Sequence, residues 1–169
     1  MIDRLITKIK QTQNPTVVGL DPTYAMIPSF IKKEMLEDYG KTPKAVAEMF
    51  LKFNKAILDE VSDLIPAVKP QVAMYEQYGL EGLRAYIETI AYARSKGLVV
   101  IGDVKRGDIA STAAAYAGHI AGVDIEGVHM DLWQEDAVTL NPYMGYDGIS
   151  PFIEACNKYD RGVFILVNK

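Results

Sequence analysis

The chain has 169 residues, enough for one domain with a buried core, and its 49% hydrophobic and 24% charged content is ordinary for a globular protein. A net charge of −4 gives no basic footprint for nucleic acid, and no apolar run reaches the roughly 18 residues that a membrane helix needs. Residues 1–5 are amphipathic rather than a signal peptide, and the single cysteine, Cys156, excludes an internal disulfide framework. One cysteine fits a reducing compartment, so we expect a cytoplasmic protein.

Apolar runs alternate with amphipathic helical patterns along the chain. The first helix has Thr42 as N-cap and Pro43 at its first position, and Gly97 stops the second helix. In chain order the pattern predicts a strand at 16–22, a helix at 42–61, a strand at 64–70, a helix at 80–96, a strand at 98–103, a helix at 111–121, a strand at 137–141, a helix at 149–158 and a strand at 162–168.

Near-continuous apolar strands that alternate with helices predict an α/β fold with a parallel sheet. Each apolar run stops at a polar residue, namely Asp21, Lys69, Asp103, Asn141 and Asn168. In a (β/α)8 barrel these carboxyl ends form the catalytic face, and an open doubly wound sheet also binds ligands there. Because no glycine-rich nucleotide-binding motif follows the first strand, we favour the (β/α)8 barrel.

The number of strand–helix units conflicts with a closed barrel. We identify about five βα units in this sequence, whereas a closed barrel needs eight units and typically about 250 residues. Five units would leave an open sheet edge and an uncovered apolar face. We therefore expect residues 1–169 to be a single barrel domain that is incomplete at its C-terminus, within a longer polypeptide.

The most informative motif follows the predicted strand at 98–103. Asp103 and Lys105 are two positions apart, so on a strand they share one face. Asp108 lies beyond Gly107 and belongs to the following loop or helix start. A carboxylate and an ammonium side by side at a strand end form a candidate site, although a structural salt bridge would have the same local pattern.

Four segments together resemble the orotidine 5′-phosphate decarboxylase family, and most of all its longer-chain bacterial subfamily. These segments are residues 19–22, 68–70, 103–109 and 141–147. The resemblance implies a (β/α)8 barrel that forms a homodimer with its active sites at the interface. It also implies decarboxylation of orotidine 5′-phosphate to UMP in pyrimidine biosynthesis, with no cofactor and no metal.

The resemblance assigns roles to individual residues. The residues that it implies to be catalytic are Lys69, Asp103, Lys105 and Asp108. The residues expected to contact the substrate are Asp21, Lys69, Ile109, Thr112 and Asn141. Within these sets Lys105 would be the proton donor and Asp21 would bond the ribose hydroxyls. Asp108, Ile109 and Thr112 would reach into the neighbouring subunit's site.

The chemistry of decarboxylation explains why these residue types are needed. Loss of CO2 leaves a carbanion, which the ammonium of Lys105 can stabilise as a charge and quench as a general acid. Repulsion between Asp103 and the departing carboxylate is worth roughly 4 kcal/mol for charges about 4 Å apart at an effective dielectric near 20. The hardest enzymatic reactions need on the order of 20 kcal/mol. Binding energy from remote parts of the substrate must therefore supply much of the rest.

Two other functions remain open. One is a magnesium-dependent sugar-phosphate enzyme of the hexulose-phosphate synthase type, which shares the D-x-K-x-x-D pattern but has an acidic metal ligand where this chain has Lys69. A lysine does not join an oxygen-ligand magnesium site, which disfavours this alternative. The other is a nucleotide-binding barrel without catalysis. His119 and His129 have no partners at metal-ligand spacing, so we predict no metal site.

Overall fold

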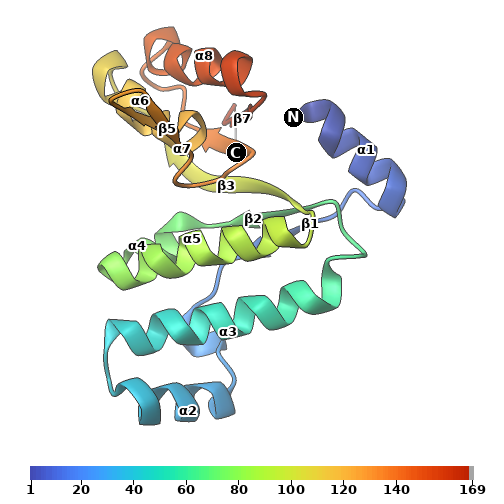
Figure 1. Cartoon of the computed structure of the whole chain (residues 1–169), viewed down its shortest axis with the longest axis vertical. Coiled ribbons are helices and arrows are strands. Elements are labelled where there is room, and N and C mark those ends of the chain that lie inside the picture. The colour runs from blue at the N-terminus through green and yellow to red at the C-terminus, as the bar shows by residue number, and fades with distance from the viewer. Residues whose placement is uncertain (168–169) are drawn as a thin grey trace.

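Five parallel strands form the central sheet of the computed structural model, in which residues 1–167 are described (Figure 1). Their order across the sheet is β1 (Val17–Leu20), β2 (Ala67–Pro70), β3 (Val99–Arg106), β6 (Ala137–Leu140) and β7 (Gly162–Ile165). Each strand pairs with its sheet neighbours in parallel, and helices connect successive strands, as in a (β/α) barrel. The predicted fold class is confirmed. The predicted strand-end residue Asn168 lies outside the described residues.

Most of the helices pack against one face of the curved sheet, and α1 lies against the other face (Figure 1). The helices are α1 (Ile2–Thr12), α2 (Ser29–Tyr39), α3 (Pro43–Val61), α4 (Val72–Glu76), α5 (Gly79–Ser95), α6 (Ala110–Tyr116), α7 (Gly118–Ala121) and α8 (Ser150–Tyr159), with short 3-10 helices η1 (Tyr24–Met26) and η2 (Tyr146–Gly148). A two-stranded hairpin of β4 (Val123–Ile125) and β5 (Val128–Met130) stands apart from the main sheet. None of the helices within the described residues could cross a membrane.

The N-terminus of α3 follows its sequence signal. The Thr42 hydroxyl accepts a hydrogen bond from the Ala45 backbone N–H at 3.2 Å, and Pro43 occupies the first helical position. Phe50 and Leu58 lie on the buried face of this helix. Figure 1 shows α3 between α5 and α2, so α2 forms an outer layer and does not cover the sheet itself.

Several elements differ from the sequence prediction. The single helix expected at residues 111–121 is two helices, α6 and α7, because hydrogen bonding tightens at their junction: the Ile120 N–H donates to the Ala117 carbonyl, three residues earlier. Sequence patterning did not identify α2, α4 or the β4–β5 hairpin, and α1 was recognised only as an amphipathic opening. The predicted strand at 64–70 begins at Ala67. The strand predicted at 98–103 continues to Arg106, and the one predicted at 162–168 ends at Ile165 within the described residues.

The two faces of the sheet have different neighbours because side chains alternate along each strand. Val100 and Val104 belong to the main core between the sheet and the helices. Val99 and Ile101 face the opposite side, where they cluster with Ala67, Ala137 and the Met1 side chain at the start of α1. We call this second side the inner face. α1 therefore covers the amino-terminal part of the inner face and leaves its carboxyl-terminal part to polar residues.

Candidate active site at the carboxyl ends of the strands

Asp103 stands at the centre of a polar array on the inner face. Lys69 at the end of β2 donates to its Oδ2 atom at 2.5 Å, and Lys105 donates to its Oδ1 atom at 2.5 Å. Asp103 is only 5% exposed, whereas the lysine side chains are 34% and 46% exposed. The strand ends thus bring three of the four predicted catalytic residues into direct contact, with the carboxylate buried and the ammonium groups accessible to solvent.

Two further residues complete the array, and sequence reasoning missed both. Gln71 donates from Nε2 to Asp103 Oδ2 at 3.0 Å, and the Thr139 hydroxyl donates to Asp103 Oδ1 at 2.9 Å. Strand periodicity could have found them: Gln71 is two residues after Lys69, and Thr139 is two residues after the inner-face residue Ala137. Asp103 therefore accepts four side-chain hydrogen bonds.

The surroundings of Asp103 favour its ionised form. Burial acts to raise the pKa of this carboxyl, but hydrogen bonds from Lys105, Lys69 and Thr139 outweigh burial and lower the pKa below its usual value of 3.8. The array therefore holds a fixed negative charge between two amino groups at neutral pH. Such an arrangement can bind an anionic substrate through the amino groups and can supply a proton.

The backbone at Lys105 is unusual. Lys105 has φ 46°, in the left-handed region that side chains other than glycine rarely adopt. The pairing of β3 with β6 shifts register between Gly102 and Arg106, so the chain bulges where Lys105 lies. A left-handed non-glycine residue costs about 1–2 kcal/mol and persists where the surrounding structure holds it. Strain of this kind is concentrated at functional sites.

Among the described residues, the remaining predicted site residues make no hydrogen bond or ion pair with the array. Asp108 accepts from the neighbouring Ile109 N–H at 2.7 Å, and no contact with the array is found among the described residues. Asp21 follows β1 and is exposed. Asn141 accepts from the Tyr143 N–H at 3.0 Å and thereby starts the loop after β6. Ile109 is 55% exposed and Thr112 is half-buried.

Two glycines allow the loops after β3 and β6 to touch. A Cβ atom at Gly107 would lie 2.5 Å from the Asn141 carbonyl oxygen, and one at Gly148 would lie 2.6 Å from the Asp108 carbonyl oxygen. Only glycine permits backbones to approach this closely. The segment that carries Asp108 is therefore held against the loop that begins at Asn141.

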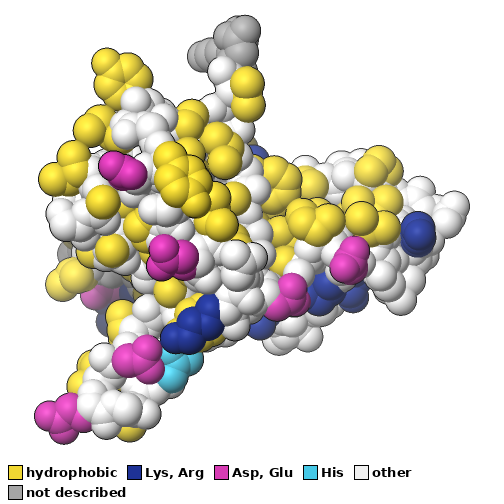
Figure 2. All heavy atoms as spheres, turned by 90° about the horizontal axis from the view of Figure 1, so that it is seen from above, with side chains coloured by type: hydrophobic (Ala, Val, Ile, Leu, Met, Phe, Trp, Pro, Cys, Tyr) yellow, Lys and Arg dark blue, Asp and Glu magenta, His cyan; other side chains and the backbone are white. Residues whose placement is uncertain are grey.

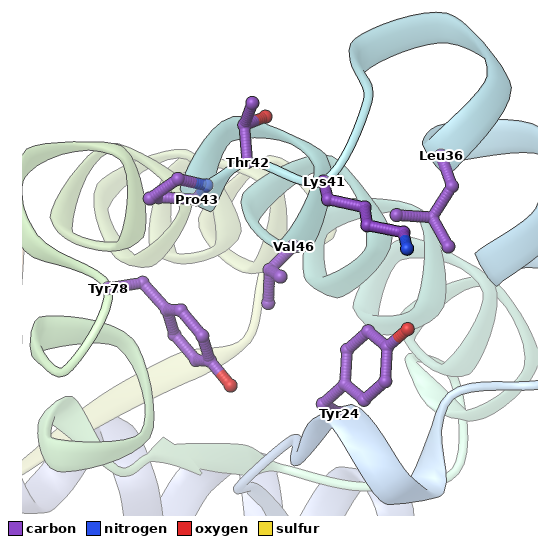
Figure 3. A pocket seen from close by; sticks show the side chains of 7 residues that line it. All are labelled: Tyr24, Leu36, Lys41, Thr42, Pro43, Val46 and Tyr78. Carbon is purple, nitrogen blue, oxygen red and sulfur yellow. The ribbon is translucent and has the colours of Figure 1, made fainter.

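A cavity of about 400 Å³ lies apart from the array (Figure 3). Tyr24 and Tyr78 face the space between them, with Val46 on its floor and Lys41 at its edge. None of its lining residues belongs to the array, and its walls are mainly apolar. We place the candidate site at the array because that is where charged groups converge. Within residues 1–167, no group of three or more potential metal ligands is present.

A parallel sheet with helices between its strands and charged side chains near its carboxyl ends is the arrangement of a (β/α)-barrel domain. Residues 15–168 match the model of the orotidine 5′-phosphate decarboxylase / HUMPS family, so the chain belongs to that family. The predicted family resemblance is confirmed.

Individual relatives agree with this assignment. The chain is 39% identical over 168 residues to the orotidine 5′-phosphate decarboxylase of Petrotoga mobilis, covering 99% of this chain and 52% of that protein. The same identity and coverage hold for the enzyme of Clostridium acetobutylicum. The structure of Leishmania donovani OMP decarboxylase superposes with a TM-score of 0.70 at 29% identity, over 97% of this chain and 52% of that one. The chain thus spans about half the length of the curated relatives it matches.

Proposed function

We propose that this chain carries the catalytic array of an enzyme that decarboxylates orotidine 5′-phosphate to UMP in pyrimidine biosynthesis, without a metal or cofactor. The observation that carries the proposal is the Lys69–Asp103–Lys105 array, with both lysine Nζ atoms 2.5 Å from the central carboxylate. Its relatives named as orotidine 5′-phosphate decarboxylases support the same substrate. The single cysteine is consistent with a cytoplasmic location.

Each member of the array has a role in this reaction. The bond from the ring carbon to the carboxylate breaks, its electron pair stays on the carbon, and Lys105 Nζ delivers a proton to that carbon. Asp103 orients the Lys105 ammonium through their hydrogen bond and repels the departing carboxylate. Lys69 balances the charge of Asp103 from the other side. Asp21 and Asn141, at neighbouring strand ends, are proposed to contact the substrate.

A specific contact weighs against the magnesium-dependent alternative. Divalent magnesium requires oxygen ligands around an octahedral site. The Asp103 oxygens that such an ion would need each accept from a lysine, at 2.5 Å in both cases. The array is therefore better suited to an organic anion than to a metal–substrate complex.

The whole protein provides the direct test. Purified enzyme is dialysed against a chelator and mixed with orotidine 5′-phosphate, and the change in ultraviolet absorbance is followed. We expect turnover that the chelator leaves unchanged and that Lys105→Ala abolishes, with Lys33→Ala on the exposed surface of α2 as the control. Activity that disappears with the chelator and returns with magnesium would support the sugar-phosphate enzyme instead.

We also propose that further βα units, outside residues 1–169, complete the barrel. The support is the coverage of about half of each relative and the five strands of the sheet, which has edges at β1 and β7. A polypeptide limited to residues 1–169 is expected to be inactive. Full activity of that polypeptide as a monomer would contradict this proposal.

A homodimer with shared sites is the third part of the proposal. Asp108 does not contact its own array, and Ile109 beside it is 55% exposed. Hydrophobic side chains gather across the face seen in Figure 2. The loop after β6 adds exposed apolar groups, with Tyr143 90% and Tyr146 70% exposed. Surfaces of this kind mark protein contacts.

Subunit mixing tests the shared site. Lys105→Ala and Asp108→Asn chains, each inactive alone, are refolded together. If Asp108 acts across the interface, one site of each hybrid dimer contains both intact residues, and activity returns. Hybrid dimers seen by native mass spectrometry without recovered turnover would assign Asp108 to its own chain.

A further inference from the structure

One hydroxyl group connects both charged members of the β3 motif. Thr139 is 8% exposed and lies on β6, beside β3. Its Oγ1 donates to Asp103 Oδ1 at 2.9 Å and accepts from the Lys105 backbone N–H at 2.9 Å. A hydroxyl can donate one hydrogen bond while it accepts another, so Thr139 satisfies both groups at once.

The register of the sheet explains why a side chain is needed at this point. Gly102 pairs with Val138 and Arg106 pairs with Leu140, so residues 103–105 of β3 lie opposite Thr139 alone. The bulge moves the Lys105 N–H out of the regular ladder, and the Thr139 hydroxyl takes the place of a backbone carbonyl as its acceptor. The left-handed φ of 46° at Lys105 occurs in the same bulge.

We infer that Thr139 is a positioning residue for the proposed proton donor. Its hydroxyl holds the left-handed backbone of Lys105, and this backbone directs the lysine side chain back toward Asp103. Its second hydrogen bond orients the Asp103 carboxylate that the Lys105 ammonium contacts. The role in catalysis rests on the proposed function, whereas the role in holding the bulge does not.

The positioning role depends on the Thr139 hydroxyl and not only on the shape of the side chain. Valine has nearly the same volume but can neither accept from the Lys105 N–H nor donate to Asp103 Oδ1. It would remove one hydrogen bond from the buried Asp103 carboxylate and the side-chain acceptor of the Lys105 N–H, and the bulge would relax. A shift of the acid by about 1 Å can lower turnover on the order of 10²-fold. The KM should change little, because the hydroxyl is bonded to protein groups and does not need to touch the substrate.

The test compares Thr139→Val with Thr139→Ser in the whole protein. The amide hydrogen exchange rate of Lys105 is measured by nuclear magnetic resonance relative to that of Val100. The Val100 N–H donates to Asp136 at 2.9 Å, and its exchange rate serves as the internal reference for global opening. In Thr139→Val we expect at least tenfold faster exchange at Lys105 relative to Val100, with kcat lowered on the order of 10²-fold. Thr139→Ser should restore both. Thr139→Ala, which also lacks the hydroxyl, replaces the valine variant if that variant does not fold.

Thr89→Val is the matched control. Thr89 is fully buried, and its hydroxyl accepts from Asn54 at 3.2 Å, away from the array. The Thr89→Val variant should leave the amide exchange rate of Lys105 relative to Val100 unchanged. Unchanged Lys105 exchange in Thr139→Val and Thr139→Ala would overturn the inference. If Lys105 exchange changes as expected but neither the parent nor any variant turns over orotidine 5′-phosphate, the role of Thr139 in holding the bulge stands. The proposed function would then be rejected.

Discussion

Two buried carboxylates at opposite ends of the sheet have different cationic partners. Asp103, at the carboxyl end, is bound by lysines, whereas Asp136, just before β6 at the amino end, is bound by arginines. Asp136 has a side chain 1% exposed and contacts Arg4 at 2.7 Å, Arg94 at 3.0 Å and Arg161 at 3.5 Å. These arginines come from α1, from α5 and from the residue before β7.

Arginine and lysine suit different roles as partners of a buried carboxylate. A guanidinium keeps its charge and binds carboxylates with a rigid set of donors, but it does not release a proton at ordinary pH. An ammonium on a flexible stem can reorient and can act as an acid. The arginines around Asp136 therefore suit a structural role, in which they join distant parts of the chain. The lysines around Asp103 are ammonium groups of the type that can donate a proton. This division agrees with the general behaviour of barrel faces.

The largest effect on turnover is expected when lysine and arginine are exchanged at the two carboxylates. Lys105→Arg keeps the positive charge but removes the proton donor, so we expect turnover of orotidine 5′-phosphate to fall by about 10²–10⁴-fold. The reverse exchange, Arg94→Lys at the amino end, should leave kcat within about threefold, since it touches no reacting group. Both are measured by steady-state kinetics. Substantial activity in Lys105→Arg would remove Lys105 from the proton-donor role.

The second prediction concerns stability. Asp136→Ala removes the common partner of three arginines and the acceptor of the Val100 N–H. We expect the free energy of unfolding to fall by about 2–4 kcal/mol, slightly less than for a fully buried pair because the Arg4 side chain is 43% exposed. Urea denaturation measures the change. Glu34→Ala is the control, because its contact with Lys52 is on the surface and should be worth less than about 1 kcal/mol. Equal effects of the two variants would contradict the stabilising role of Asp136.

A third buried carboxylate supports β3 from behind. Glu135 is fully buried, accepts from the Tyr86 hydroxyl and contacts His119 Nδ1 at 2.8 Å. Burial and the charge of Glu135 raise the pKa of Tyr86 well above its usual value, so this phenol stays a donor. The Glu135 carboxylate lies against Gly102, where an added Cβ atom would be 2.2 Å from its Oε1 atom.

Gly102→Ala should therefore disturb the back of the array. We expect a loss of about 1–3 kcal/mol in the free energy of unfolding, because a fixed carboxylate must move. Gly118→Ala is the matched control, since nothing lies within 4 Å of its added Cβ. Thermal unfolding compares the two variants. A Gly102→Ala protein as stable as Gly118→Ala would mean that Glu135 can move freely.

The smallest expected effect is a pH dependence of stability. Burial acts to raise the pKa of Asp103 in the folded protein, but hydrogen bonds from Lys105, Lys69 and Thr139 together outweigh burial and lower this pKa. Its contribution to stability is therefore present above the unfolded pKa of about 3.9 and is lost as the pH falls through the lower, folded value. We expect the stability difference between the parent and Asp103→Asn to narrow below about pH 4 in urea titrations. A difference that stays constant from pH 7 to pH 2 would contradict the lowered pKa.

Local pattern was sufficient to predict much of the architecture. The alternation of strands and helices follows from periodicities of two and 3.6 residues, which depend on near neighbours in sequence. The convergence of Lys69 and Asp103 was expected for a related reason, since parallel strands present their carboxyl ends together. Asp103 and Lys105 do contact each other, as their spacing predicts.

The reason for that contact was not available from spacing alone. A regular strand would place Asp103 and Lys105 on one face, but the observed contact passes through a bulge with a left-handed Lys105. That bulge depends on how β3 pairs with β6, and its acceptor, Thr139, is 34 residues from Lys105.

The sequence by itself therefore determined the five strands of the main sheet, most of the helices between them, the family and the identity of the charged groups at the strand ends. Only the tertiary structure decided which partners those groups have, namely Thr139 and Gln71 for Asp103, and arginines from three distant segments for Asp136. The physical reason is the difference in sequence separation between the interacting residues. Element formation follows from interactions along one segment, whereas register and convergence are set by packing between segments that the sequence separates.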